Sequence, residues 1–294
     1  MDADIIYTKN CSSMDEVLQE SVDLIITGPP YWRYIDYSAY VDQKEFVWPK
    51  GNSYESYFED LKKWFTECFR VLRKGRYCII NLGTVRKDGR CYAIPFHSVP
   101  VLEDIGFEFC FEIIWHKISG GRRHARGIIQ HPYPGYYIPN NRTEYLLVFR
   151  KDSSTPFYEE KSKLKTKKHQ IEIDDFFKKQ VANNVWYIMP PCFPLNGKHP
   201  CPFPPEIPYR LIPLFSTKGE IVLDPFMGIG TTARAARMLG RRFIGYEIQQ
   251  SFVDIALASI DEPLQIRNPT ICHYDTLNKK DTSKNKKIHG KCKS

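Results

Sequence analysis

A glycine-bearing turn between two acids, in the last third of the chain, has the residue types of a nucleoside-binding site. A short apolar run at 221–223 ends in Asp224, and Gly228 and Gly230 follow before a run of good helix formers. Glycines let the backbone approach a ligand closely, and the start of a helix directs free N–H groups outward. Glu247 ends the next apolar run about 20 residues after Gly228, where dinucleotide-binding folds place the acid that holds ribose hydroxyls. The pattern predicts strand, turn, helix and strand, with a ligand-free βαβ unit as the alternative.

A double proline at the end of an earlier apolar run is the second stretch that could do chemistry. The predicted strand at 22–27 runs directly into Gly28-Pro-Pro-Tyr-Trp32. Two prolines end the strand, because they fix φ and donate no hydrogen bond to a neighbouring strand. The carbonyls of Gly28 and Pro29 then project at the carboxyl end of the strand, where open α/β sheets bind their ligands. A proline-terminated strand whose aromatic residues pack in the core is the alternative.

Length and composition bound the remaining possibilities. At 294 residues we expect one large domain, or one domain with a substantial insertion, and a net charge of +8 suits a polyanionic partner. The nine cysteines form no C-x-x-C pair, and Cys192, His199 and Cys201 are too few and too poorly spaced for zinc. No signal peptide and no apolar stretch near the length of a membrane span is visible. We therefore expect a cytoplasmic protein with reduced thiols, no bound metal and no membrane association.

The apolar periodicity predicts the elements that must position these two stretches. Short strands are expected at 4–7, 22–27, 76–82, 107–115, 144–150, 221–223 and 242–247. Helices are expected at 14–19, 54–72, 91–105, 173–180, 208–215, 233–239 and 251–260. Gly75 is expected to close the helix at 54–72, and Thr231 or Thr232 to cap the helix at 233–239. The strands at 107–115 and 144–150 are suited to pairing as an antiparallel hairpin.

Four segments resemble the motifs of one enzyme family, the S-adenosylmethionine-dependent amino-methyltransferases that act on DNA. Residues 224–232 match its motif I, D-P-F-x-G-x-G-T-T, in full, and 27–32 resemble its motif IV, a double proline before an aromatic residue. The runs I-I-W-x-K and T-E-Y-L-L-V-F, at 113–117 and 143–149, resemble motif VIII, and H-P-x-P-F-P at 199–204 resembles motif X. The order IV, VIII, X, I is that of the β group of this family, and the resemblance spans roughly residues 4–262.

The resemblance implies an α/β fold, with a doubly wound, mostly parallel sheet of the Rossmann-like methyltransferase type, an antiparallel hairpin and a small target-recognition insertion. Residues 1–150 are expected to form the catalytic half of the sheet, 151–195 the target-recognition insertion and 196–262 the cofactor-binding half. Residues 263–294 are expected to be a disordered basic tail. The double-proline corner and the glycine turn should then meet at one edge of the sheet.

The resemblance also assigns roles to individual residues. The residues that it places around S-adenosylmethionine are His199, Pro202, Phe203, Asp224, Pro225, Phe226, Gly228, Gly230, Thr231, Thr232 and Glu247. The residues that it places at the transferred methyl group are Thr27, Gly28, Pro29, Pro30 and Tyr31. In the family, the aromatic ring stacks on a flipped-out base and the first proline's carbonyl accepts from the exocyclic amine. Transfer is direct, so no cysteine is expected to act as a nucleophile.

One position departs from the family's motif IV. Gly28 occupies the place where the family carries Asp, Asn or Ser, so Thr27, a backbone carbonyl or a water must serve as the acceptor for the amine. The leading Thr27 and the following Trp32 resemble the T-S-P-P-Y-W form that is associated with cytosine N4. We therefore expect methylation of cytosine N4 in duplex DNA. The alternatives are adenine N6, an RNA or other amine, and a catalytically inactive DNA-binding relative; the absence of G-x-G-x-x-G disfavours an NAD-dependent oxidoreductase.

Two long connections carry residues suited to contacting DNA. Residues 33–53 are rich in aromatic side chains, which suit a DNA-contacting surface or a lid and suit a minor core under the loop equally well. Arg122, Arg123 and Arg126 lie in a connection that suits phosphates and bases, with a solvated loop as the alternative. Trp32 is also expected to contact DNA. The expected partner is duplex DNA, with a cognate restriction endonuclease acting on the same site as a second, and the expected state is a monomer or weak dimer.

Overall fold

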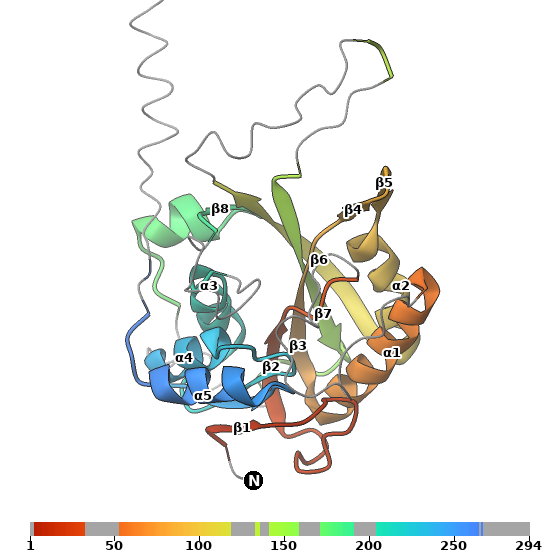
Figure 1. The fold of residues 1–294 in the computed structure, drawn as a ribbon. Coiled ribbons are helices and arrows are strands. Elements are labelled where there is room, and N and C mark those ends of the chain that lie inside the picture. The colour runs from red at the N-terminus through yellow and green to blue at the C-terminus, as the bar shows by residue number, and fades with distance from the viewer. Residues whose placement is uncertain are drawn as a thin grey trace, which may run out of the picture.

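The computed structural model describes residues 3–32, 53–118, 133–135, 141–158, 171–190, 204–264 and 266. These residues build an eight-stranded sheet with helices packed on both of its faces (Figure 1). The order across the sheet is β1-β10-β9-β2-β3-β7-β6-β8. These strands are β1 (Ile5–Tyr7), β2 (Val22–Thr27), β3 (Leu72–Leu82), β6 (Phe107–Lys117), β7 (Thr143–Lys151), β8 (Val185–Ile188), β9 (Ile221–Asp224) and β10 (Arg242–Tyr246).

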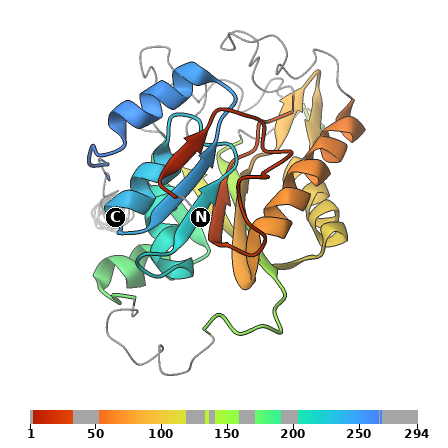
Figure 2. The same cartoon turned by 90° about the horizontal axis from the view of Figure 1, so that it is seen from below.

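The directions of the strands bring several carboxyl ends to one edge of the sheet. The five strands β1, β10, β9, β2 and β3 run parallel to one another. β7 runs antiparallel to both β3 and β6, and β8 is parallel to β6. The predicted fold class, a mostly parallel sheet with an antiparallel β6–β7 hairpin, is therefore confirmed. Figure 2 shows β1, from the start of the chain, lying beside β10 from the last third.

Helices cover the two faces of the sheet and bury two apolar cores. α1 (Tyr54–Val71) and α2 (Ile94–Ile105) lie on one face, and α3 (Glu206–Phe215) and α4 (Thr231–Met238) lie on the other, with α5 (Gln250–Ser259) beside α4 (Figure 1). One core forms under α1 and α2 and the other under α3 and α4. Within the part of the chain that the structure describes, no helix combines the length and the apolar character needed to cross a membrane.

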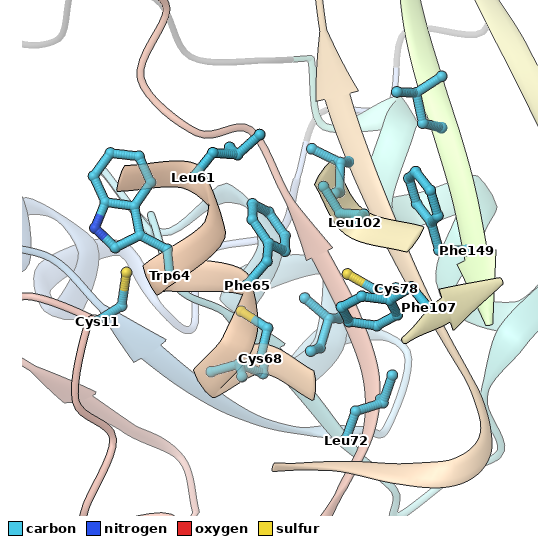
Figure 3. Close-up of a cluster of buried hydrophobic side chains, with 14 of the residues drawn as sticks. Cys11, Leu61, Trp64, Phe65, Cys68, Leu72, Cys78, Leu102, Phe107 and Phe149 are labelled. Carbon is cyan, nitrogen blue, oxygen red and sulfur yellow. The ribbon is translucent and has the colours of Figure 1, made fainter. Parts of the chain in front are cut away.

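The long helix α1 forms as its apolar periodicity predicts. Its buried residues, which recur at helical spacing, are Tyr57, Leu61, Trp64, Phe65, Cys68 and Val71. Ser53 caps its first turn, where the Ser53 hydroxyl oxygen accepts a 3.0 Å hydrogen bond from the Ser56 amide. Figure 3 shows the apolar stripe of α1 facing Cys78 and Phe149 of the sheet. The same buried cluster includes Tyr31 and Trp32 of the double-proline corner.

The helix predicted at residues 14–19 is wrong. This segment forms turns, and Met14 is fully buried under α1. The Met14 amide donates to Glu67 Oε2 over 2.9 Å, and Arg70 Nη2 donates to the Met14 carbonyl over 2.8 Å. Side chains of α1 therefore bind both backbone groups of Met14, including the carbonyl that a local helix would have paired internally.

Several predicted boundaries also differ from the structure. α1 ends at Val71 and β3 begins at once, so Gly75 lies inside a strand, with φ of +74°, and closes no helix. Cys91 and Tyr92, predicted as the start of a helix, lie in strand β5 (Arg90–Tyr92), which pairs with β4 (Val85–Lys87). The helical piece predicted at 173–180 is a π-helix, η6 (Phe177–Val181), at its carboxyl end.

Candidate active site at the carboxyl edge of the sheet

The double-proline corner and the glycine turn lie at the same edge of the sheet. β2 and β9 are neighbours, with Leu24 opposite Val222 and Ile25 opposite Leu223. Because the two strands are parallel, their carboxyl ends emerge together. The Thr27 hydroxyl at the end of β2 donates a 2.7 Å hydrogen bond to the Asp224 carboxylate at the end of β9. The two segments that the sequence analysis expects to meet are therefore directly bonded.

Asp224 is the buried centre of this edge. Its carboxylate accepts hydrogen bonds from the hydroxyls of Thr27 and Thr232, the latter over 2.6 Å, and from the amide of Phe226 over 3.0 Å. Burial raises the pKa of Asp224 to about 6, and the three hydrogen bonds oppose that rise.

The prediction that Thr231 or Thr232 caps α4 is wrong, because the cap position is Gly230 and the Thr232 hydroxyl bonds to Asp224.

The glycine turn after Asp224 is held between β10 and α5. Gly228 and Gly230 have φ of +53° and +83°, in the left-handed region that favours glycine. A Cβ atom on Gly230 would lie 2.8 Å from the Cβ atom of Ala256 in α5, so the helix packs directly on the turn. A Cβ atom on Gly245 of β10 would lie 2.3 Å from Cε of Met227, so the turn also packs directly on that strand.

Glu247 follows β10 and faces the glycine turn. Its Oε2 accepts a 2.8 Å hydrogen bond from the Gly228 amide, and its Oε1 accepts a 2.9 Å bond from the Gln249 amide. Burial raises the pKa of Glu247, and these backbone donors oppose the rise. A carboxylate oxygen can accept more than one hydrogen bond, so both oxygens retain acceptor capacity for a pair of hydroxyls. An acid, a glycine turn and a helix start thus fit a nucleoside with a free ribose.

The apolar side of this site comes from an unexpected element. The ring of Phe226, which follows Asp224 by two residues, meets the indole of Trp64 edge to face, with 5.0 Å between ring centroids. Trp64 belongs to α1, which lies across the other face of the sheet. The first helix thus closes one side of the turn, a contact that the local sequence around residues 224–232 could not reveal.

Tyr31 closes the double-proline corner and is anchored through its hydroxyl. The ring is mostly buried, and the hydroxyl donates a 2.8 Å hydrogen bond to Glu144 Oε2 at the start of β7. Asn81 Nδ2, near the end of β3, donates to the same Glu144 oxygen over 2.8 Å and to the Tyr31 hydroxyl over 3.2 Å. Lys117, the last residue of β6, pairs with the other Glu144 oxygen. We call these four residues the Glu144 network.

Three members of the Glu144 network, Asn81, Lys117 and Glu144, are not among the site residues predicted from the sequence. Lys117 and Glu144 lie in the two runs that resemble motif VIII, but the resemblance assigned no function to either residue. Asn81 lies in the apolar run of β3, where a polar residue near the carboxyl end of a buried strand was a usable signal. Their contact depends on the neighbouring positions of β3, β7 and β6, which only the folded sheet establishes.

Trp32 faces inward. Its side chain is 4% exposed and packs against Tyr54 and Tyr92, with ring centroids 5.0 Å and 4.5 Å away. These rings form part of an open cavity of about 330 Å³ beside the corner, lined by Trp32, Ser53, Tyr54, Glu55, Arg90, Cys91, Tyr92, Ala93 and His97. The alternative of aromatic packing is thus realised for Trp32, and its contact with DNA stays a prediction.

The other predicted site residues divide into two groups. Pro29, Pro225 and Thr232 are buried, while Gly28, Pro30, Phe226 and Thr231 are half-buried at the same edge. The remaining predicted contacts lie outside the described residues: His199, Pro202, Phe203, Arg122, Arg123, Arg126, the aromatic segment 33–52, and the Cys192 and Cys201 thiols. Their roles stay predictions.

Three buried cysteines are poor nucleophiles. Cys11, Cys68 and Cys78 are buried, and burial raises the pKa of each thiol. A raised thiol pKa suppresses the reactive thiolate at neutral pH. This agrees with direct transfer without a covalent intermediate on any of these three residues.

Comparison with known proteins identifies one family and several relatives. The family of N6/N4-type DNA methylases matches residues 22–258. The Type II methyltransferase M.MthZI of Methanothermobacter thermautotrophicus is 32% identical over 284 residues, which cover 90% of this chain and 79% of the relative. The Type II methyltransferase M.MjaI of Methanocaldococcus jannaschii is 32% identical over 283 residues, which cover 88% of this chain and 90% of the relative.

Two solved structures have a similar fold. TTHA0409 of Thermus thermophilus, solved with S-adenosyl-L-methionine, aligns with a TM-score of 0.66 at 26% identity, covering 87% of this chain and 93% of that chain. The cytosine-N4-specific PvuII DNA methyltransferase aligns with a TM-score of 0.65 at 16% identity, covering 90% of this chain and 89% of that chain. The second likeness is a likeness of fold alone.

Proposed function

This chain belongs to the N6/N4 DNA methylase family, and on that premise we propose that it methylates the N4 amine of a flipped-out cytosine in duplex DNA. The broader activity, S-adenosylmethionine-dependent methylation of an exocyclic amine in DNA, follows from the family. The observation that carries the proposal is the direct bond between Thr27 and Asp224, which joins the base corner to the cofactor turn.

The glycine turn and its two acids are the proposed cofactor site. The carboxylate of Glu247, directly after β10, is placed to accept hydrogen bonds from the ribose hydroxyls. Asp224 holds the end of the turn through the bond that its carboxylate accepts from the Thr232 hydroxyl. The Phe226 ring supplies an apolar face, and we propose that His199, Pro202 and Phe203 complete the wall. When bound, S-adenosylmethionine supplies an electrophilic methyl group on its sulfonium.

The double-proline corner is the proposed site of the reacting amine. The Thr27 hydroxyl proton is committed to Asp224, and Thr27 is only 1% exposed. Because the Thr27 side chain is buried and bonded in this way, the backbone carbonyls of Gly28 and Pro29 are the better candidates for the acceptor of the amine proton. A carbonyl that accepts an amine proton favours a tetrahedral nitrogen and holds its lone pair in one direction, a form of positioning that can supply several kcal/mol.

The choice of cytosine N4 depends on residues around the two prolines. Thr27 before Gly28 and the Tyr31-Trp32 pair after Pro30 support the cytosine form of the motif. We propose further that residues 151–195 and Arg122, Arg123 and Arg126 read the DNA. M.MthZI and M.MjaI are named Type II methyltransferases, which supports a restriction endonuclease acting on the same site as a partner of this chain.

The decisive experiment is transfer of a labelled methyl group to unmethylated duplex DNA, followed by digestion to nucleosides. We expect the label in N4-methylcytosine. Label in N6-methyladenine would overturn the base assignment and leave the enzyme class in place. Transfer to RNA alone, or cofactor and DNA binding without any transfer, would overturn the proposed function itself.

A further inference from the structure

Asn81 lies beside the position where the family's amine acceptor is missing. β2 and β3 are parallel neighbours, and Thr27, the last residue of β2, lies opposite Ile80 of β3. The next residue along each chain is Gly28 on one side and Asn81 on the other. Gly28 has no side chain to offer, whereas Asn81 carries an amide and is only 4% exposed.

The Glu144 network fixes which way the Asn81 amide faces. A carboxylate only accepts hydrogen bonds, so the amide nitrogen of Asn81 must face Glu144, to which it donates over 2.8 Å. The same nitrogen donates to the Tyr31 hydroxyl over 3.2 Å, and Lys117 pairs with the carboxylate. The amide oxygen is consequently directed away from Glu144.

The Asn81 amide oxygen is a buried acceptor with capacity to spare. Among the residues that the structure describes, Oδ1 of Asn81 is buried and accepts no hydrogen bond. Buried polar atoms are almost always paired, so an exception beside a reaction site points to a ligand atom that pairs it. A neutral oxygen at the end of β3, beside the double-proline corner, suits an N–H donor such as an exocyclic amine.

We propose that Asn81 Oδ1 accepts a hydrogen bond from the exocyclic amine of the flipped-out base and supplies the side-chain acceptor that Gly28 lacks. The inference rests on the proposed function of the corner, and it applies equally to the N4 amine of cytosine and the N6 amine of adenine. Asn81 and the backbone carbonyls together hold both amine protons. Glu144 and Lys117 are positioning residues, because they act on the amine only through the orientation of Asn81.

The test compares full-length wild type, Asn81→Leu, Gly28→Ser and the double variant in labelled methyl transfer to unmethylated plasmid DNA. Leucine keeps approximately the size of asparagine and removes the acceptor, so we expect kcat to fall about 100-fold, the scale seen when one preorganised hydrogen-bonding group is removed from an active site. Cofactor affinity, measured by calorimetry, should stay within about twofold. Gly28→Ser in the Asn81→Leu background should recover about tenfold, because a hydroxyl at position 28 restores an acceptor.

Recovery by serine separates an acceptor role from a structural one. Loss of packing at position 81 could not be repaired by a hydroxyl on the neighbouring strand, and Gly28 is not among the described glycines with positive φ, so serine fits its backbone. Glu103→Leu, a change from a polar side chain to leucine at an exposed residue of α2, is the control and should leave kcat unchanged. Normal kcat in Asn81→Leu, or no recovery in the double variant, overturns the inference.

Two further outcomes keep the inference separate from the proposed function and from misfolding. If the wild type transfers no methyl to DNA, the proposed function falls and the inference falls with it. An active wild type with normal kcat in Asn81→Leu overturns the inference alone.

If Asn81→Leu does not fold, Glu144→Gln takes its place. A glutamine can donate as well as accept, so the Asn81 amide is no longer held in one orientation and kcat should fall about tenfold. Unchanged kcat in that variant would also overturn the inference.

Discussion

Thr27 and Asp224, which are 197 positions apart in the chain, are joined by a buried hydrogen bond of 2.7 Å. Each is the last residue of its strand, and the two strands are neighbours in the sheet. Thr232, in the first turn of α4, bonds to the other oxygen of the same carboxylate. One acid therefore couples the corner proposed for the base, the turn proposed for the cofactor and the helix behind it.

Replacing Asp224 by alanine should abolish cofactor binding. The change removes the acceptor for Thr27, Thr232 and the Phe226 amide, and each donor left unpaired costs roughly 1–3 kcal/mol. The glycine turn should lose its shape, so we expect at least about a 100-fold loss in S-adenosylmethionine affinity by calorimetry, equivalent to about 2.7 kcal/mol. Asp254→Ala, at an exposed position on α5, is the control. Unchanged affinity in Asp224→Ala would remove the role assigned to this acid.

The raised pKa of Asp224 predicts a definite pH dependence of stability. Its folded-state pKa of about 6 lies above its ordinary value of 3.8, so the folded protein holds this proton more tightly than the unfolded chain does. The contribution of this carboxyl to the free energy of unfolding should therefore fall as pH rises from 3.8 to about 6 and stay level above that. Asp224→Asn removes the titration.

Denaturant unfolding of the cofactor-free wild type and of Asp224→Asn, at several pH values between 4 and 7, measures this effect. The free energy of unfolding of the wild type minus that of the variant should decrease across the window, by an amount on the order of 1–3 kcal/mol. Acids that lie outside the influence of the Asp224 charge titrate alike in both proteins and cancel in the difference, whereas Glu247, whose pKa that charge raises, cancels only in part. A difference that rises with pH, or is constant, would contradict the prediction.

Local rules account for the elements that the sequence predicted well. Val22–Thr27 is a run of apolar and β-branched residues, interrupted only by Asp23 and followed by Gly28 and two prolines, and β2 has these bounds. The run at 221–223 ends in an acid and a glycine turn, and β9 has the same start and includes Asp224. Both depend on strand propensity and on residues that end strands, which neighbouring residues determine.

Elements whose partners are distant were not predictable in this way. Residues 14–19 resemble a capped helix, but Glu67 and Arg70 of α1 bind the Met14 backbone. The Glu144 network combines residues from β3, β6, β7 and the corner, and no spacing in the sequence specifies their contact. The β4–β5 ribbon is different: its turn, Asp88-Gly89, has φ of +50° and +75°, and an Asp-Gly pair between short strands was a readable hairpin signal.

Tyr31 should be needed for transfer and dispensable for cofactor binding. Tyr31→Ala removes the ring from the corner, so we expect kcat to fall by about 100-fold or more while S-adenosylmethionine affinity stays within about twofold. Tyr31→Phe keeps the ring and removes the hydroxyl with its bonds to Glu144 and Asn81, so its kcat should fall by about three- to tenfold. Steady-state transfer and calorimetry on the same preparations measure both. Turnover in Tyr31→Ala equal to that of the wild type would exclude the ring from the reaction.

Gly230→Ala should destabilise the protein more than the same change at Gly219. Both glycines have φ near +85°, at +83° and +87°, so alanine suffers a similar backbone penalty of roughly 1–2 kcal/mol at each position. A Cβ atom at Gly219 meets nothing within 4 Å, whereas at Gly230 it would lie 2.8 Å from the Ala256 Cβ atom and push α5 away from the turn. We expect about 1–3 kcal/mol of additional destabilisation at Gly230, with weaker S-adenosylmethionine binding there alone. Denaturant unfolding and calorimetry of the two variants measure the difference, and equal losses of stability would show that α5 does not constrain the cofactor turn.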